Sequence, residues 1–168
     1  MVKILLATLI VTVLYSCKNT GSMEEPVSSE GNNTVSISII KQLAQCAPRE
    51  PGVEIIESSV DLEKWWKLAS RASLPQPALP TTLREVQFDH QQLIVVNLGS
   101  KPSLGYSVEL LEKHAVVEKN NLIVALQENG PSADMLTAQV VTTPCAVLLT
   151  EKTGFSEVIL KGLEANNQ

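Results

Sequence analysis

Two runs of β-prone residues near the middle of the chain show its most regular hydrophobic pattern. Residues 93–98 are almost wholly apolar, as in a strand covered on both faces, whereas residues 106–111 alternate. The segment between them contains Gly99 and Gly105, which tolerate positive φ, and Pro102, which restricts φ. We therefore expect the two runs to form a hairpin with a stiff tip.

A helix and further strands are expected on either side of this hairpin. The helix is predicted to begin near Ser58 or Ser59, which can cap it, because apolar residues then recur at i, i+3, i+4 and i+7: Leu62, Trp65, Trp66 and Ala69. Further strands are predicted at residues 35–44, 53–57, 115–117, 122–126, 139–149 and 155–160, the fifth interrupted by Pro144. The fold class is α+β: a mostly antiparallel β sheet or sandwich with one or two helices. The tryptophans are expected in the core, with a ligand platform as the alternative.

The first residues predict an exported protein. Lys3 precedes an uncharged, mostly apolar run at residues 4–15. This run is shorter than the roughly 20 residues that span a bilayer, and it is typical of a signal peptide. We therefore assign residues 1–16 to a lipoprotein signal peptide, with an ordinary secretory signal as the alternative.

The end of this segment indicates a lipid anchor. Residues 14–17, Leu-Tyr-Ser-Cys, resemble a bacterial lipobox, and the resemblance implies that Cys17 carries palmitate or similar acyl chains and holds the protein on a membrane. Lys18 follows where an aspartate would favour the inner membrane, so the resemblance implies the periplasmic face of the outer membrane. Residues 17–34 contain few apolar side chains and are expected to form a flexible tether.

The remaining segment, residues 35–162, is expected to form a single β-rich domain, with a frayed C-terminus at residues 163–168. Export to an oxidising compartment leaves Cys46 and Cys145 as an even pair once Cys17 is acylated, which predicts a disulfide between them. Two buried free thiols are the alternative.

Composition and charge limit the possible functions. The chain has 168 residues, 44% of them hydrophobic and 18% charged, with a net charge of −5. These values suit one globular domain, and the acidic balance argues against a nucleic-acid partner. The two histidines, His90 and His114, lie in polar surroundings, and no nucleophile, paired carboxylates or metal-ligand spacing accompanies them. We therefore expect no enzymatic activity, cofactor or metal.

Several short motifs resemble one protein family. They are Phe88-Asp89, the run from Val95 to Val108 that contains Gly-Ser-Lys-Pro-Ser-Leu-Gly-Tyr, an Asn-Gly-Pro loop at residues 129–131, and Val-Thr-Thr-Pro at residues 141–144. Together they resemble the C-terminal domain of the PrcB family of bacterial envelope proteins, over roughly residues 65–160. The resemblance implies a non-enzymatic protein that stabilises a secreted protease.

The centre of this resemblance is the candidate partner-binding loop, which we call the 101–106 loop: Lys101, Pro102, Ser103, Leu104, Gly105 and Tyr106. The family commonly has Gly-Gly-Tyr at the tip, whereas this chain has Leu104 before Gly105. Through Pro102, Gly105 and Tyr106 the loop is also similar to the wedge of chagasin-type cysteine protease inhibitors. Leu104 and Tyr106 would be its anchors, with an inward-pointing Tyr106 as the alternative.

Three functions therefore remain open. The leading hypothesis is a lipid-anchored envelope protein whose loop binds, and thereby stabilises, a secreted protease or another envelope protein. The second hypothesis is a direct protease inhibitor, and the third is a purely structural envelope lipoprotein.

Overall fold

The computed structural model describes residues 33–46, 49–71, 73–132 and 136–163. The predictions for residues 1–32, including lipidation of Cys17, and for residues 164–168 lie outside these ranges. In the covered part of the chain, no helix is long and apolar enough to cross a membrane.

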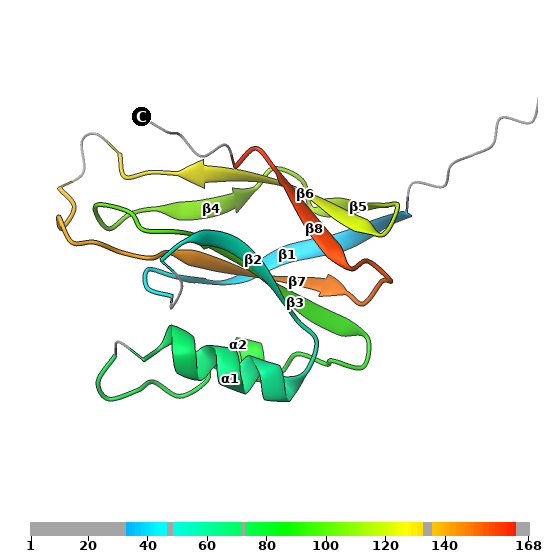
Figure 1. The fold of residues 1–168 in the computed structure, drawn as a ribbon, viewed down its shortest axis with the longest axis horizontal. Helices are drawn as coiled ribbons and strands as arrows, with labels where there is room; N and C mark the ends of the chain where they lie inside the picture. Colours follow the sequence, from blue (N-terminus) through cyan, green and yellow to red (C-terminus); the bar gives the residue numbers. More distant parts are fainter. Residues whose placement is uncertain (1–32, 47–48, 72, 133–135, 164–168) are drawn as a thin grey trace, which may run out of the picture. The chain divides into compact units, whose positions relative to one another are not determined.

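The described residues form eight strands and two short helices (Figure 1). In chain order they are β1 (Asn33–Leu43), β2 (Pro51–Ile56), α1 (Ser59–Ala69), α2 (Thr81–Arg84), β3 (Gln91–Leu98), β4 (Ser107–Leu110), β5 (His114–Glu118), β6 (Asn121–Asn129), β7 (Cys145–Glu151) and β8 (Glu157–Lys161). The strands follow the order β2-β3-β7-β1-β5-β6-β4, and β8 pairs with β6. All pairings are antiparallel except that of β8 with β6, which is parallel.

The sheet curls into a nearly closed, barrel-like form. The last strand in the order, β4, returns to the middle of the sheet, where the Val108 N–H donates to Gln42 Oε1 of β1 at 3.0 Å. The first part of β1 pairs with β5 and the rest pairs with β7, so β1 joins the two halves of the sheet. The predicted mostly antiparallel sheet with one or two helices is therefore confirmed, whereas the sandwich is not.

The predicted hairpin between residues 93–98 and 106–111 is wrong. β3 pairs with β2 along one edge and with β7 along the other, and β4 pairs with β6. Both edges of β3 are therefore occupied over nearly its whole length. Sequence neighbours often pair, which favoured the hairpin, but here the connection crosses from one part of the sheet to another.

The prediction that β3 is covered on both faces is confirmed, because the strand contributes to two apolar clusters. Leu93 and Val95 pack in one cluster with the helices, while Ile94 and Val96 pack in the interior of the curled sheet. All four side chains are fully buried. Figure 1 shows α1 and α2 together on one side of the sheet.

Helix α1 forms as its sequence predicts. Ser58 is the N-cap, and its Oγ accepts a hydrogen bond from the Asp61 N–H at 3.1 Å. The apolar stripe faces the sheet, with Trp65 and Trp66 only 4% and 7% exposed. The Trp66 Nε1–H donates to Pro77 O at 3.0 Å. The core interpretation of the tryptophans is therefore confirmed.

The remaining strands agree with the prediction to within a few residues, except at residues 139–149. There the regular strand begins only at Cys145, after Pro144, which lacks an N–H for the ladder. The turn between β5 and β6 contains Lys119 and Asn120 at φ 47° and 73°, the left-handed geometry expected of a tight hairpin turn.

Candidate partner-binding loop

The 101–106 loop begins at a turn that only glycine fits well. Gly99 has φ 73°, and a Cβ at this position would lie 2.8 Å from Pro51 Cδ. The next residue is anchored as well, because the Ser100 N–H donates to Arg49 O at 2.8 Å. The chain therefore leaves β3 in a fixed direction.

Main-chain hydrogen bonds hold the loop against the segment that precedes β7. Lys101 and Thr142 form an antiparallel bridge, with N–O distances of 2.8 and 2.9 Å. The Leu104 N–H donates to Ala138 O at 3.2 Å, and Thr142 Oγ1 donates to Ser103 O at 2.9 Å. Ser103 and Thr142 are buried. The loop thus owes its support to this distant segment and not to a hairpin partner.

The side chains at the two ends of the loop face each other. The ammonium group of Lys101 lies 5.3 Å from the centre of the Tyr106 ring and forms an ion pair with Glu128 Oε1 at 2.5 Å. Tyr106 is half-buried and packs against the interior cluster of the curled sheet. A Cβ on Gly130 would lie 3.5 Å from Tyr106 Cε1, so the ring also packs closely on the segment that follows β6. The inward alternative for Tyr106 therefore describes its packing better than an exposed anchor does.

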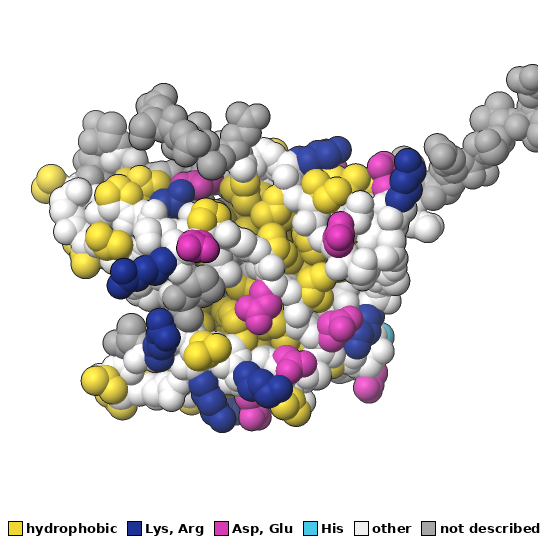
Figure 2. Space-filling model, in the orientation of Figure 1, with side chains coloured by type: hydrophobic (Ala, Val, Ile, Leu, Met, Phe, Trp, Pro, Cys, Tyr) yellow, Lys and Arg dark blue, Asp and Glu magenta, His cyan; other side chains and the backbone are white. Residues whose placement is uncertain are grey.

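Leu104 is exposed, as the partner-binding hypothesis requires. Its exposed fraction is 38%, and Pro102 beside it is also exposed. The supporting segment adds large apolar residues at the surface: Leu136, Val140 and Val141. Figure 2 shows apolar side chains at this end of the domain, which lies at the left of Figure 1. Sequence reasoning missed the second segment because it assigned Val140 and Val141 to a strand over residues 139–149.

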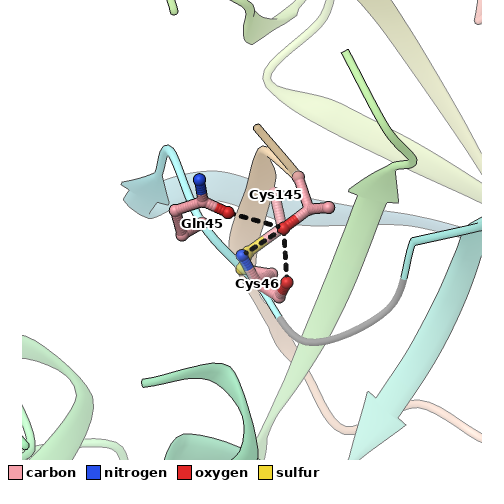
Figure 3. Close-up of a disulfide and its surroundings, with 4 residues drawn as sticks. Gln45, Cys46 and Cys145 are labelled. Atoms are coloured by element: carbon pink, nitrogen blue, oxygen red, sulfur yellow. Dashed lines mark hydrogen bonds between the residues drawn. A yellow bond between two sulfur atoms is a disulfide. The ribbon is translucent and has the colours of Figure 1, made fainter. Parts of the chain in front are cut away.

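The predicted disulfide between Cys46 and Cys145 is confirmed, with a Cα–Cα distance of 6.1 Å (Figure 3). Both cysteines are buried. Beside the disulfide, the Cys46 N–H donates to Thr143 O at 2.7 Å, and a parallel bridge pairs Gln45 with Thr143. Because Thr143 follows the Thr142 that holds the loop, the disulfide also fixes the segment that supports the loop.

The residues considered for catalysis remain separate from this loop. His90 and His114 are both exposed; His90 lies in the turn before β3, whereas His114 is the first residue of β5. In the ranges that the structure covers, no group of three or more His, Cys, Asp and Glu side chains could hold a metal ion. The pKa of Asp61 is lowered by a hydrogen bond from Ser58 and by Lys64, but Asp61 lies at the start of α1.

Comparison with known proteins adds one finding. A family model described as PrcB C-terminal matches residues 93–151, a stretch that runs from β3 to the end of β7 and contains both the 101–106 loop and Cys145. Searches of curated proteins and of solved structures found no match. The resemblance seen in the sequence is confirmed over residues 93–151, which match the PrcB C-terminal family model.

Proposed function

We propose that this protein is a non-enzymatic cell-envelope lipoprotein whose 101–106 loop binds a protein partner and stabilises it. A secreted protease is the partner that the family resemblance favours. The observation that carries the proposal is an exposed Leu104 on a loop whose backbone is hydrogen-bonded to a second segment.

The physical basis is preorganisation. A loop that is already held by hydrogen bonds loses little conformational freedom on binding, so more of its contact energy is retained as affinity. Leu104 supplies an apolar contact at the centre, and the exposed Val140 and Val141 extend the apolar surface beside it. Together they suit a partner with an apolar recess.

Direct protease inhibition is a weaker second candidate. A wedge that enters a protease cleft needs its aromatic anchor free, whereas Tyr106 packs against the interior cluster and the Lys101 side chain. Leu104 alone would remain as an anchor. A purely structural lipoprotein, the third candidate, would not depend on the exposed side chains of the loop at all.

The anchor forms a separate part of the proposal. Acylation of Cys17 would hold the domain at the periplasmic face of the outer membrane, with the residues between Cys17 and the start of β1 at Asn33 as a tether. Metabolic labelling with an alkyne palmitate should label the protein, and Cys17→Ser should abolish both labelling and membrane association. Full labelling of Cys17→Ser would contradict the anchor while leaving the loop proposal untouched.

Crosslinking from position 104 tests the loop. A photo-crosslinking amino acid at position 104 should capture a specific envelope protein, whereas the same group at position 60 should not. Val60 is also exposed, but it lies at the start of α1, which follows the end of β2 that is farther from the loop. Leu104→Ala should weaken binding of the captured protein by about tenfold, the effect of a moderate apolar anchor.

Assays on the captured protein separate the candidates. If it is a protease, a stabiliser should lengthen its active lifetime, and an inhibitor should reduce its turnover. If the combined change Leu104→Ala with Tyr106→Ala leaves every bound partner in place, the loop proposal is wrong and the structural candidate is favoured.

A further inference from the structure

A cavity of about 230 Å³ lies beside the disulfide and outside the 101–106 loop. Cys46 forms part of its wall, and its other principal lining residues are Gln45, Arg49, Leu68, Arg71, Val141 and Thr143. They come from three separate chain segments, which meet at the C-terminal end of α1. The volume suits one amino-acid residue of a bound chain better than a larger ligand.

One wall of the cavity is rigid. Figure 3 shows Gln45 and Cys46 joined to the opposite segment by hydrogen bonds and the disulfide. Thr143 Oγ1 donates to Gln45 Oε1 at 3.0 Å, and Gln45 Nε2 donates to Val141 O at 3.3 Å. The polar groups of this wall are therefore already paired with each other, which leaves recognition to the arginines.

The two arginines reach the cavity from different elements. Arg49 follows the disulfide and is fixed through its carbonyl, which accepts from the Ser100 N–H at 2.8 Å, while Arg71 follows α1. Both are exposed, and neither forms an ion pair with any acidic residue in the described ranges, including the adjacent Glu50. Two guanidinium groups at one cavity can bind a carboxylate with several charge-assisted hydrogen bonds.

The rest of the lining is apolar at the surface. Leu68 and Val141 are 54% and 66% exposed, although both are large aliphatic residues. Covering them would remove apolar area from water, so the ligand should combine a negative group with an aliphatic one. A polynucleotide supplies negative groups but no aliphatic side chain, and its binding needs a longer row of cations on a less acidic protein.

We infer that this cavity binds a carboxylate of a partner polypeptide next to an aliphatic side chain, with Arg49 and Arg71 on the carboxylate and Leu68 and Val141 on the aliphatic group. The inference rests on the proposed function only in taking the partner to be a polypeptide. The carboxylate can belong to the C-terminal residue of the partner or to an Asp or Glu side chain.

NMR of arginine side chains tests this directly. The sequence contains three arginines, so a ¹⁵N-arginine sample of the full chain in detergent micelles should show three Nε–Hε signals, with Arg84 as an internal reference. Arg84 lines a different cavity, and its guanidinium group donates a hydrogen bond to Leu79 O at 3.0 Å. Acetyl-leucyl-leucine should shift the Arg49 and Arg71 signals saturably and leave the Arg84 signal in place.

Two further probes identify the source of the carboxylate. The C-terminal amide of acetyl-leucyl-leucine should cause no shift, because it has no negative charge. Acetyl-leucyl-glutamic acid α-amide carries only a side-chain carboxylate, so binding of this probe alone would assign the ligand to an acidic side chain. Binding of acetyl-leucyl-leucine alone would assign the ligand to a C-terminus.

Variants complete the test. Arg49→Gln and Arg71→Gln should each weaken binding by about tenfold, since each removes a charge-assisted hydrogen bond, whereas Arg84→Gln should not. Equal shifts with the acid and amide probes, or equal movement of all three arginine signals, would overturn the inference. Because no partner protein is present, failure here leaves the loop proposal standing, and Leu104→Ala should not change probe binding.

Discussion

Reduction of the Cys46–Cys145 disulfide should destabilise the domain strongly. The two cysteines are 99 positions apart, so the bond closes a long loop in the unfolded chain. Chain-entropy theory for a loop of this length gives a loss of about 4 to 5 kcal/mol in the free energy of unfolding. The loss is a large share of the roughly 5–15 kcal/mol that stabilises a typical domain, and it corresponds to a fall in Tm of about 15 °C.

Urea unfolding with and without a reducing agent measures this effect. Fluorescence of Trp65 and Trp66 reports it, because both indoles are buried in the same cluster as the disulfide. Reduction keeps both sulfur atoms in place, so it creates less cavity than Cys46→Ala with Cys145→Ala does. Cys17→Ser is the matched control and should unfold like the parent chain.

The slope of the unfolding curve distinguishes this cause from others. A reduced unfolded chain is more expanded, so the denaturant m-value should rise as the midpoint falls. A loss below about 1 kcal/mol would refute the entropic reasoning for this loop. So would a large loss with an unchanged m-value, which would place the effect in the folded state.

Three further predictions concern the stability of the domain and the N-terminal cap of α1. Gly99→Ala should destabilise it by about 1–2 kcal/mol in urea unfolding, because the new Cβ meets Pro51 and φ is positive; an unchanged midpoint would contradict the turn geometry. Leu62→Ala should reduce the free energy of unfolding by about 3 kcal/mol, since Leu62 is fully buried on the apolar face of α1, and a loss under 1 kcal/mol would show that the site collapses around the gap. Ser58→Ala should raise the pKa of Asp61 toward its ordinary value in a ¹³C-carboxyl NMR titration. In the parent chain the lowered pKa makes the Asp61 carboxylate stabilise the fold above the ordinary pKa of 3.8, and this contribution is lost as pH falls through the folded-state pKa. Equal titration midpoints for Asp61 in the parent chain and in Ser58→Ala would contradict the role of the cap.

Local chemistry explains what the sequence predicts well. α1 is specified within its own residues by the Ser58 cap and by an apolar stripe of period 3.6, so no distant contact is needed to recognise it. The turn at Lys119 and Asn120 is similarly local. The disulfide is long-range, but with Cys17 assigned to the lipid only one pairing of cysteines remained.

Long-range pairing explains what the sequence does not predict. The apolar run of β3 indicates burial on both faces, but it does not reveal which strands lie on its edges, and these prove to be β2 and β7. The parallel contact of β8 with β6 also carries no signal within five residues of alternating sequence. α2 has a single turn, led by Pro80, and is too short to show a period.

The same long-range contacts place the two proposed binding elements on one framework. Val141 lines the cavity and directly precedes Thr142, whose backbone bridges Lys101 of the loop. On the other side, Arg49 lines the cavity, and its carbonyl accepts from the N–H of Ser100, the residue just before the loop.

The disulfide holds both connections, since Cys46 and Cys145 lie within a few residues of each of them. A partner that contacts both elements would therefore depend on the oxidised form, because reduction frees the segments on either side of the cavity together. A partner that contacts only Leu104 would depend less on the oxidised form, since the bridge between Lys101 and Thr142 that holds the loop is made by the backbone and not by the disulfide. Measuring partner affinity in oxidised and reduced protein thus distinguishes one composite surface from two separate ones.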